Sequence, residues 1–455
     1  MLHPIVRWVA RRAIRWFYRE MQFVNASAIP ASGPTLIVAS HGNDLPDILM
    51  TFLATNRDVL FVANIAAADS LLVRWTYRGL GIIPVTRVRD ARALRARGED
   101  ASAINANAFV RVAEALRKGH AVAIFPEGNV HDQPHLGALR TGAAKMVLQA
   151  LESGTSSLSM VPIGYQYENA SGPRSGLLGV VGTPVYLEHW KPQQPSKSVT
   201  ELTRFIRTQL KQVTRNARAQ HDAAVLSELC AATGAVMSSS NVTPIAAAHD
   251  IQLRLSRLSA ADDVFVADSI APSAISSQRG MQEFQAAATR LTNLCAGLGA
   301  HRWSARDHAD VLHAAGDATV SASRNTTFGV WALAPLAACG WLWNALPIWL
   351  CRALAVRYAP ARTDLAARTL LPGLYVMGLW YVGMPLALWI AGVHPWMVLL
   401  LFVVQPRMGD FAIGWRDRYR TLQLIRRART AQEELRVELL EAAQFVRRTL
   451  ERIKM

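Results

Sequence analysis

The sequence predicts an α/β domain, built on a mixed sheet flanked by helices, that is followed by a helical region and by C-terminal hydrophobic membrane segments. Between residues 35 and 190, short aliphatic runs of strand length alternate with longer helix-prone stretches, which is typical of an α/β sheet. Near the C-terminus, two long apolar segments contribute to a hydrophobic content of 51%. The strand-like runs are residues 35–39, 59–63, 82–85, 121–125, 160–164 and 177–181, and the clearest helical stretches are residues 105–118 and 138–151.

Residues 1–30 form the first predicted region, a basic amphipathic helix at a membrane interface. Arginines such as Arg7 and Arg12 alternate there with aliphatic and aromatic side chains. On a helix they produce a cationic sector and an apolar sector, as in helices that lie in the headgroup plane. A helix that docks on the protein itself is the alternative.

Four further regions follow along the chain. Residues 31–197 hold the α/β pattern, residues 198–327 are helix-prone without a strand pattern, residues 328–406 hold the membrane segments, and residues 407–455 form a charged closing helix. The apolar segments themselves are residues 329–351 and 371–404, the second broken around Gly392 and Pro395. Residues 372–391 alone span about 30 Å as a helix, which matches the hydrocarbon core of a bilayer.

Arginines are frequent between the two apolar segments, from Arg352 to Arg368, and again after the second segment, from Arg407 onwards. Positive charge marks the cytoplasmic side of a membrane, so both stretches are expected there. Re-entrant hairpins or an odd number of extra crossings would satisfy this expectation, and the sequence leaves both open.

The charge balance favours a lipid surface as partner. Lys and Arg outnumber Asp and Glu by 49 to 33, a net charge of +16, which suits nucleic acid, anionic lipid or phosphorylated substrates. The chain has no RNP-type motif or paired zinc ligands but does have apolar spans, so we expect membrane lipid and no nucleic acid. The N-terminus also lacks the features of a secretory signal. We therefore expect an integral membrane protein whose α/β domain lies on the cytoplasmic face.

The four cysteines follow no metal or redox spacing, and we expect buried thiols. They are Cys230, Cys295, Cys339 and Cys351.

His41 follows the strand-like run 35–39 and is the first candidate for catalysis. Pro46 suits the first turn of a helix, so Asp47 falls near the positive end of that helix. A carboxylate that hydrogen-bonds one ring nitrogen fixes the tautomer of the imidazole and leaves the other nitrogen free to accept a proton. This arrangement predicts a general base for a hydroxyl, with Asp47 as its partner and Asp44 as the competing one.

Three further groups follow strand ends in the same region. Arg87 comes after residues 82–85 and could grip a phosphate bidentately. Gly128 permits a turn whose amide faces an oxyanion or phosphate, while Glu127 could hold an acceptor hydroxyl or stiffen that turn. Arg140 lies at a helix start, where anions bind readily. No serine or cysteine has the setting of a nucleophile elbow, which argues against a covalent intermediate.

In their order and spacing these blocks resemble the glycerolipid acyltransferase superfamily. The matching blocks are His41-x5-Asp47, residues 81–87, residues 125–128 and residues 161–164. The resemblance points to the branch of fungal glycerol-3-phosphate/dihydroxyacetone-phosphate acyltransferases and their bacterial relatives. Two departures stand out: five residues instead of the commoner four separate His41 from Asp47, and Arg140 replaces a lysine frequent in the branch.

The resemblance implies a membrane-bound O-acyltransferase of phospholipid synthesis that uses acyl-CoA or acyl carrier protein as co-substrate and needs no other cofactor and no metal. The acceptor would be a hydroxyl of glycerol-3-phosphate or lysophosphatidate. His41 would deprotonate it and Asp47 would orient His41, while Arg87, Arg140 and Gly128 would hold the phosphate.

Three alternatives remain at this point. The first is an acyltransferase that acts on another lipid acceptor, and the second is an inactive relative anchored at the bilayer. The third is a metal-dependent membrane hydrolase whose ligands come from His41, Asp44, Asp47, His131, Asp132 and His135.

Overall fold

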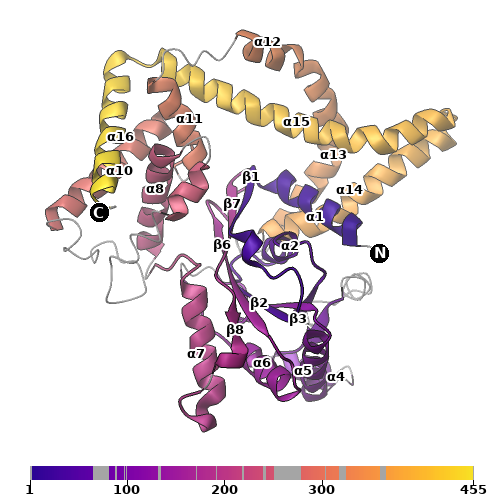
Figure 1. Ribbon diagram of the computed structural model, residues 1–455. Helices are drawn as coiled ribbons and strands as arrows, with labels where there is room; N and C mark the ends of the chain where they lie inside the picture. Colours follow the sequence, from indigo (N-terminus) through magenta and orange to yellow (C-terminus); the bar gives the residue numbers. More distant parts are fainter. Residues whose placement is uncertain are drawn as a thin grey trace. The chain divides into compact units, whose positions relative to one another are not determined.

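A computed structural model shows how the chain folds (Figure 1). The chain divides into two compact units. The first comprises Met1–Arg11, Gln22–Gln166 and Leu178–Arg215, and the second comprises Arg12–Met21, Tyr167–Leu177 and Asn216–Met455. The structure describes residues 3–64, 81–87, 90–96, 98, 100–131, 135–170, 172–190, 192–217, 220–238, 242–250, 278–302, 304–316, 324–358 and 365–453.

An eight-stranded mixed sheet forms the core of the α/β region, with the strand order β1-β7-β6-β2-β5-β3-β4 and with β8 paired to β6. The central strands β6, β2, β5, β3 and β4 are mutually parallel, whereas β8 is antiparallel to β6. The α/β fold predicted from the sequence is confirmed. The strands are β1 (Glu20–Val24), β2 (Thr35–Ala39), β3 (Val59–Asn64), β4 (Ile83–Val85), β5 (Ala121–Ile124), β6 (Ser159–Tyr167), β7 (Gly176–Val181) and β8 (Val185–Tyr186).

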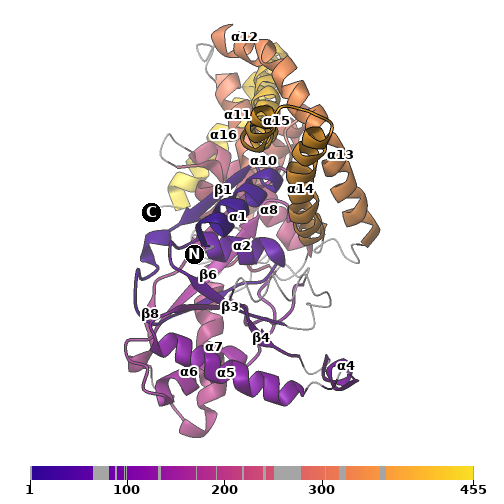
Figure 2. The same ribbon diagram turned by 90° about the vertical axis from the view of Figure 1, so that its right-hand side faces the viewer.

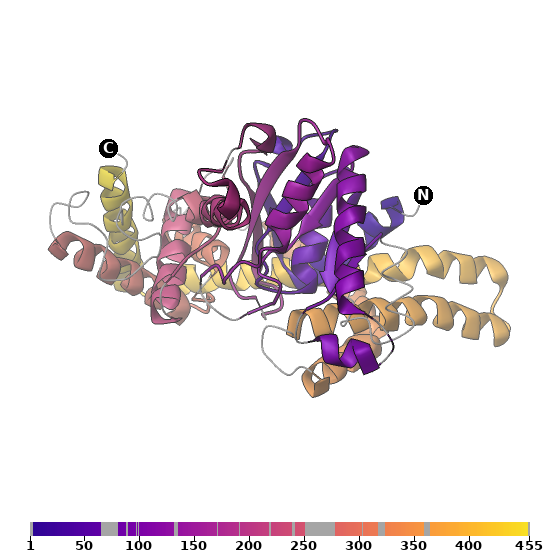
Figure 3. The same ribbon diagram turned by 90° about the horizontal axis from the view of Figure 1, so that it is seen from below.

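Helices cover both faces of this sheet, which explains why its inner strands are continuous apolar runs and do not alternate. All residues of β2 and β5 are buried. Helices α5 (Ala101–Arg117), α6 (Gly142–Glu152) and α7 (Ser198–Lys211) lie on one side and α2 (Leu45–Leu53) on the other (Figure 2). In Figure 3 the purple α5 and α6 lie in front of the strands. A short helix, α4 (Ala91–Ala96), precedes α5.

The N-terminal segment differs from its prediction. Helix α1 (His3–Phe17) ends early, and residues 20–24 form the edge strand β1. The ring of Phe23 packs on Gly179 of β7, where an added Cβ would lie only 2.6 Å from Phe23 Cδ1. This strand was missed because mixed polar and apolar residues over so short a stretch fit a helix as well as a strand.

The basic side chains of α1 contact protein groups. Arg7 donates a hydrogen bond to the carbonyl of Phe52 at 2.9 Å, and Arg12 forms a 2.7 Å ion pair with Asp410. These are contacts of a helix docked on the protein, the alternative that the sequence left open.

The second unit is helical, as predicted. Helices α8 (Gln220–Met237), α10 (Gln278–Gly297), α11 (Ala305–Gly316) and α16 (Glu433–Ile453) share an apolar core with the last turns of α15 (Pro395–Thr430). Phe284 and Val446 are fully buried in it. The same unit holds α12 (Arg324–Ala332), α13 (Ala334–Tyr358) and α14 (Leu365–Ile390).

By length and composition, two helical stretches of this unit could cross a membrane, Ala334–Arg357 and Pro395–Thr430. Many of their apolar side chains point outward, and Leu342, for example, is 76% exposed. Cys339 on α13 is exposed as well. The expectation that every cysteine is buried is therefore wrong for Cys339, because the outer face of this helix is itself apolar.

Candidate functional site

The candidate site lies at the edge of the sheet where the parallel strands end. The register pairs Val38 of β2 with Ile124 of β5, and Ile124 with Val62 of β3. The carboxyl ends of these strands therefore lie level, which is where open α/β sheets bind their ligands. His41 and Glu127 follow β2 and β5, two neighbouring strands, so the fold itself brings them together.

The imidazole of His41 is held by Asp47. Asp47 Oδ2 lies 3.1 Å from His41 Nδ1 and accepts a 2.8 Å hydrogen bond from the backbone amide of Asn43. Because a carboxylate can only accept, this contact assigns the ring proton to Nδ1 and makes Nε2 an acceptor. In the part of the chain that the structure describes, no hydrogen-bond partner contacts Nε2 of His41.

Burial and packing hold this pair in place. The side chain of Asp47 is fully buried, whereas that of His41 is 11% exposed, so an edge of the ring remains open. The ring stacks on Phe125 with centroids 4.4 Å apart. Thr51 donates to the carbonyl of Asp47 at 2.8 Å and contacts the Tyr165 hydroxyl at 2.6 Å. These contacts fix the tautomer and the direction of the His41 ring, two conditions that a general base has to meet.

Asp44, the competing partner, occupies a different position. It is the residue just before α2, with φ 42° and ψ −114°, and its side chain makes no cap hydrogen bond. A positive φ is uncommon for a residue other than glycine and marks local strain, which often occurs at functional sites. In the structure the ring of His41 bonds to Asp47.

A tight turn follows β5 and places Gly128 beside Arg140. The amide of Gly128 donates to the carbonyl of Phe125 at 3.0 Å, and the amide of Arg140 donates to the carbonyl of Pro126 at 2.7 Å. Gly128 has φ +70°, and an added Cβ would lie 3.3 Å from Arg140 Cγ. The exposed Arg140 side chain therefore runs close along the glycine. A cation therefore lies beside the turn, but the amide of Gly128 is bonded to Phe125 and does not face an incoming oxyanion as the sequence predicted.

Glu127 is buried, only 4% exposed, and its carboxylate joins His41, Gly137 and His131; we call this arrangement the clamp. Oε1 accepts the backbone amide of His41 at 2.8 Å, and Oε2 accepts the amide of Gly137 at 2.7 Å and a hydrogen bond from His131 Nε2. Of the two roles that the sequence allows for Glu127, these contacts match the stiffening one. Sequence reasoning had not given His131 or Gly137 this role, because nothing local links positions 127 and 137.

The charge state of Glu127 follows from these contacts. Burial by itself raises the pKa of the Glu127 carboxyl. The hydrogen bonds from His131, His41 and Gly137 and the charge of His131 outweigh burial and hold the pKa below its usual range. The clamp is therefore a carboxylate at neutral pH.

Arg87 stands apart from the other candidates. It follows β4, which is three strands away from β2 in the sheet, or about 14 Å at the usual strand spacing. Its carbonyl accepts the amide of Asp90 at 3.0 Å, and the neighbouring Thr86 is held by the Asn105 side chain at 2.8 Å. Strands β5 and β3 thus lie between the strands that precede Arg87 and His41.

Metal ligation was one of the alternatives. Among the described residues, no three His, Cys, Asp or Glu side chains gather as a metal site would require. Asp132, one of the ligand candidates, lies outside the described residues.

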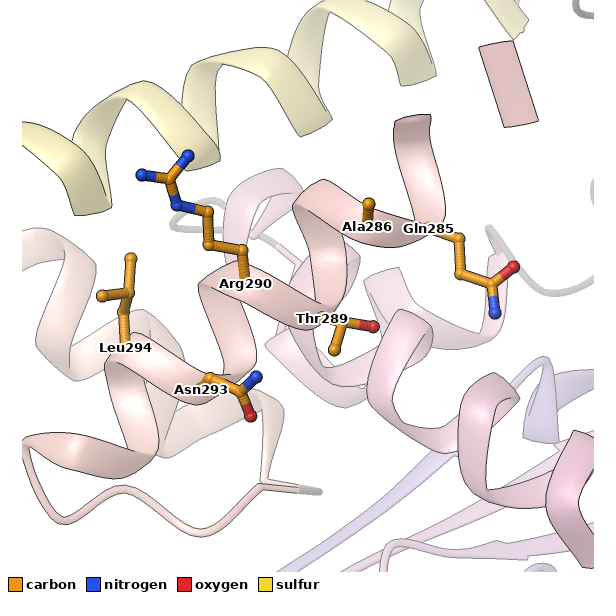
Figure 4. Close-up of a pocket in the computed structure, with 6 residues that line it drawn as sticks. All are labelled: Gln285, Ala286, Thr289, Arg290, Asn293 and Leu294. Carbon is orange, nitrogen blue, oxygen red and sulfur yellow. The ribbon is translucent and has the colours of Figure 1, made fainter. Parts of the chain in front are cut away.

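A separate hollow of about 700 Å³ lies on α10 in the second unit (Figure 4). One of its side chains, Arg290, is engaged with Glu438 at 2.8 Å. None of the candidate catalytic or phosphate-binding residues lines it, so this hollow is distinct from the site at the sheet edge. Its lining is Gln285, Ala286, Thr289, Arg290, Asn293 and Leu294.

Comparison with known proteins gives one family and several relatives. Residues 20–166 match the family model "Acyltransferase". The chain is 24% identical over 291 residues to an uncharacterized acyltransferase of Schizosaccharomyces pombe, covering 46% of this chain and 43% of that protein. It is 34% identical over 119 residues to glycerol-3-phosphate O-acyltransferase 2 of Saccharomyces cerevisiae, covering 25% of this chain and 16% of that protein. The match thus spans less than half the length of either relative.

Among solved structures, the chain is similar to that of the 1-acyl-sn-glycerophosphate acyltransferase PlsC from Thermotoga maritima. The TM-score is 0.33 at 16% identity, with 46% of this chain and 80% of that chain covered.

Proposed function

We propose, from the acyltransferase-family domain that residues 20–166 form, that this chain is a membrane-bound O-acyltransferase of phospholipid synthesis. It would move a fatty acyl group from acyl-CoA or acyl carrier protein to a hydroxyl of glycerol-3-phosphate or lysophosphatidate. The observation that supports the chemistry best is the pair of His41 and buried Asp47, 3.1 Å apart at the carboxyl end of β2.

The proposed reaction proceeds in one displacement without a covalent enzyme intermediate. His41 Nε2 takes the proton of the acceptor hydroxyl while the oxygen of that hydroxyl attacks the thioester carbonyl. The new C–O bond forms, the tetrahedral oxyanion collapses and the C–S bond breaks. The proton then passes from His41 to the departing thiolate. Asp47 stabilises the imidazolium in between and keeps its direction fixed.

The acceptor's anionic end would be bound further along the same sheet edge. Arg87 would grip the phosphate through paired hydrogen bonds, and Arg140 beside Gly128 would add a second cation. Glu127 would act on the acceptor only indirectly, since both of its oxygens already bind protein groups.

Membrane association is supported by the two apolar helical stretches and by the similarity to a glycerol-3-phosphate acyltransferase. The outward apolar side chains of α13, α14 and α15, such as Leu379 at 74% and Leu399 at 68% exposure, would contact lipid. We place the α/β domain on the cytoplasmic face, where the arginines that flank the apolar segments are expected.

The direct test is an in vitro reaction of the purified full chain in bilayers. Glycerol-3-phosphate and lysophosphatidate are each offered with acyl-CoA and with acylated acyl carrier protein, and products are identified by lipid mass spectrometry. We expect an acylated phosphorylated acceptor, formed at the same rate after chelator treatment. Activity that chelator abolishes and a divalent metal restores would support the hydrolase alternative, and no product with any acceptor would support the inactive relative.

A further inference from the structure

We propose that His131 is a positioning residue for this acyl transfer: it fixes the Glu127 carboxylate, which in turn holds the backbone of His41. The inference rests on the function proposed for His41. It gives a defined task to a side chain that the sequence marked only as a possible metal ligand.

The contacts form a continuous chain. His131 Nε2 donates to Glu127 Oε2, and the other oxygen of the same carboxylate accepts the amide of His41 at 2.8 Å. Only one carboxylate therefore lies between the two histidines. Since Glu127 carries the His41 backbone, a small rotation of the carboxylate moves the general base with it. Misplacement of reacting groups by about 1 Å can lower a rate roughly 100-fold.

The pair is fitted closely and has little freedom to rearrange. The side chain of Glu127 is 3% exposed and that of His131 is 24% exposed. An added Cβ at Gly137 would lie 2.8 Å from Glu127 Oε2 and 2.9 Å from His131 Cδ2. Only a glycine lets the backbone approach both groups, so Gly137 is part of the clamp.

The loop that carries Gly137 is anchored from the other side as well. Arg207 of α7 donates to the carbonyls of Gly137 at 2.7 Å and of Leu136 at 3.3 Å. The loop then reaches Arg140, a proposed phosphate ligand. The clamp consequently couples the proton-accepting and the phosphate-binding sides of the site.

Several charged groups surround Glu127. His131 faces it with its ring and His41 with its backbone amide, Arg140 lies beside the turn at Gly128, and Arg207 holds the outer side of the loop. Beyond the ring of His41 lies Asp47. Loss of His131 removes one of the three donors to this carboxylate, so the carboxylate would hold the backbone of His41 less firmly.

The experiment compares His131→Ala, His131→Gln and His120→Ala as full chains in bilayers. His120 is exposed and directly precedes β5, and its hydrogen bonds are made by its backbone, so it is the matched control. For His131→Ala we expect kcat to fall roughly 10- to 100-fold, with KM for the acyl donor within about twofold. His131→Gln, which keeps a donor, should recover most of kcat.

Gly137→Ala is the second variant, because it should force the same clamp open without removing a functional group, and we expect a similar fall in kcat. If folded His131→Ala keeps the wild-type kcat or loses activity through KM, or if His131→Gln is no better than Ala, the inference is wrong. A wild-type chain that transfers acyl groups to no acceptor would overturn the proposed function itself, and this inference with it. An active wild type with unaffected variants would overturn the inference alone.

Discussion

Glu127→Gln separates the two roles that the sequence allowed for this residue. The carboxylate accepts three donors, from His41 at 2.8 Å, from Gly137 at 2.7 Å and from His131. An amide keeps one acceptor but turns an NH₂ group toward donors on the other side. It also loses the charge that makes each such bond worth about 1.5–3 kcal/mol.

The structure therefore predicts a loss of about 2–4 kcal/mol of stability, or a fall in Tm of roughly 5–15 °C. At a temperature where the variant is folded, kcat should fall about 10- to 100-fold because His41 is less well held. KM for the phosphorylated acceptor should change by less than about twofold. Thermal melts followed by steady-state kinetics measure both quantities, with exposed Glu152→Gln as the control.

The pH dependence of stability gives a further check. The pKa of Glu127 is held below its ordinary value of 4.5. Its stabilisation is complete above about pH 4.5 and is lost as the pH falls through the folded-state pKa. Glu127→Gln should lack this acid-dependent loss. A variant with wild-type stability and a KM raised more than about tenfold would refute the clamp and show that Glu127 holds the acceptor.

Three more predictions follow from other residues. Arg87→Ala should raise KM for the phosphorylated acceptor about 30- to 150-fold, the loss of roughly 2–3 kcal/mol of charge-assisted bonding, whereas exposed Arg92→Ala should not. Gly128→Ala, at φ +70° and against Arg140, should cost about 1–2 kcal/mol and raise the same KM several-fold. Burial, with Glu20 and Asp307, raises the pKa of Glu168 to about 7 from 4.5. The free energy of unfolding should therefore fall as the pH rises from about 4.5 to about 7, and Glu168→Gln should remove that slope.

Each of these three predictions would be contradicted by one result. An unchanged KM in Arg87→Ala would remove that residue from the phosphate site. Wild-type stability and kinetics in Gly128→Ala would mean that the turn tolerates a side chain. A stability profile with the same slope in Glu168→Gln as in wild type would assign the titration to another group.

The sheet and the place of His41 could be predicted from the sequence because both depend on local patterns. Aliphatic runs such as β2 and β5 end in turn-forming residues, and residues after strand ends gather at one edge of a parallel sheet. Asp47 was within reach of the same reasoning, since Pro46 marks the helix start next to it.

What could not be predicted depends on contacts between distant positions. The clamp joins residues 41, 127 and 137, and no periodicity relates them. The strand β1 was missed because Phe23 needs Gly179 opposite it, a condition visible only in three dimensions. The docking of α1 likewise depends on remote groups, among them Asp410.

The central claim is that His41 removes the acceptor's proton, and transfer of a labelled acyl chain to glycerol-3-phosphate and to lysophosphatidate tests it most directly. We expect His41→Ala to reduce transfer to the better acceptor by a factor of about 10² to 10⁴, with acyl-CoA binding and Tm close to wild type and with His120→Ala fully active. If His41→Ala, folded and able to bind acyl-CoA, transfers the label within about threefold of the wild-type rate, which leaves no room for a general base at this position, the account is wrong.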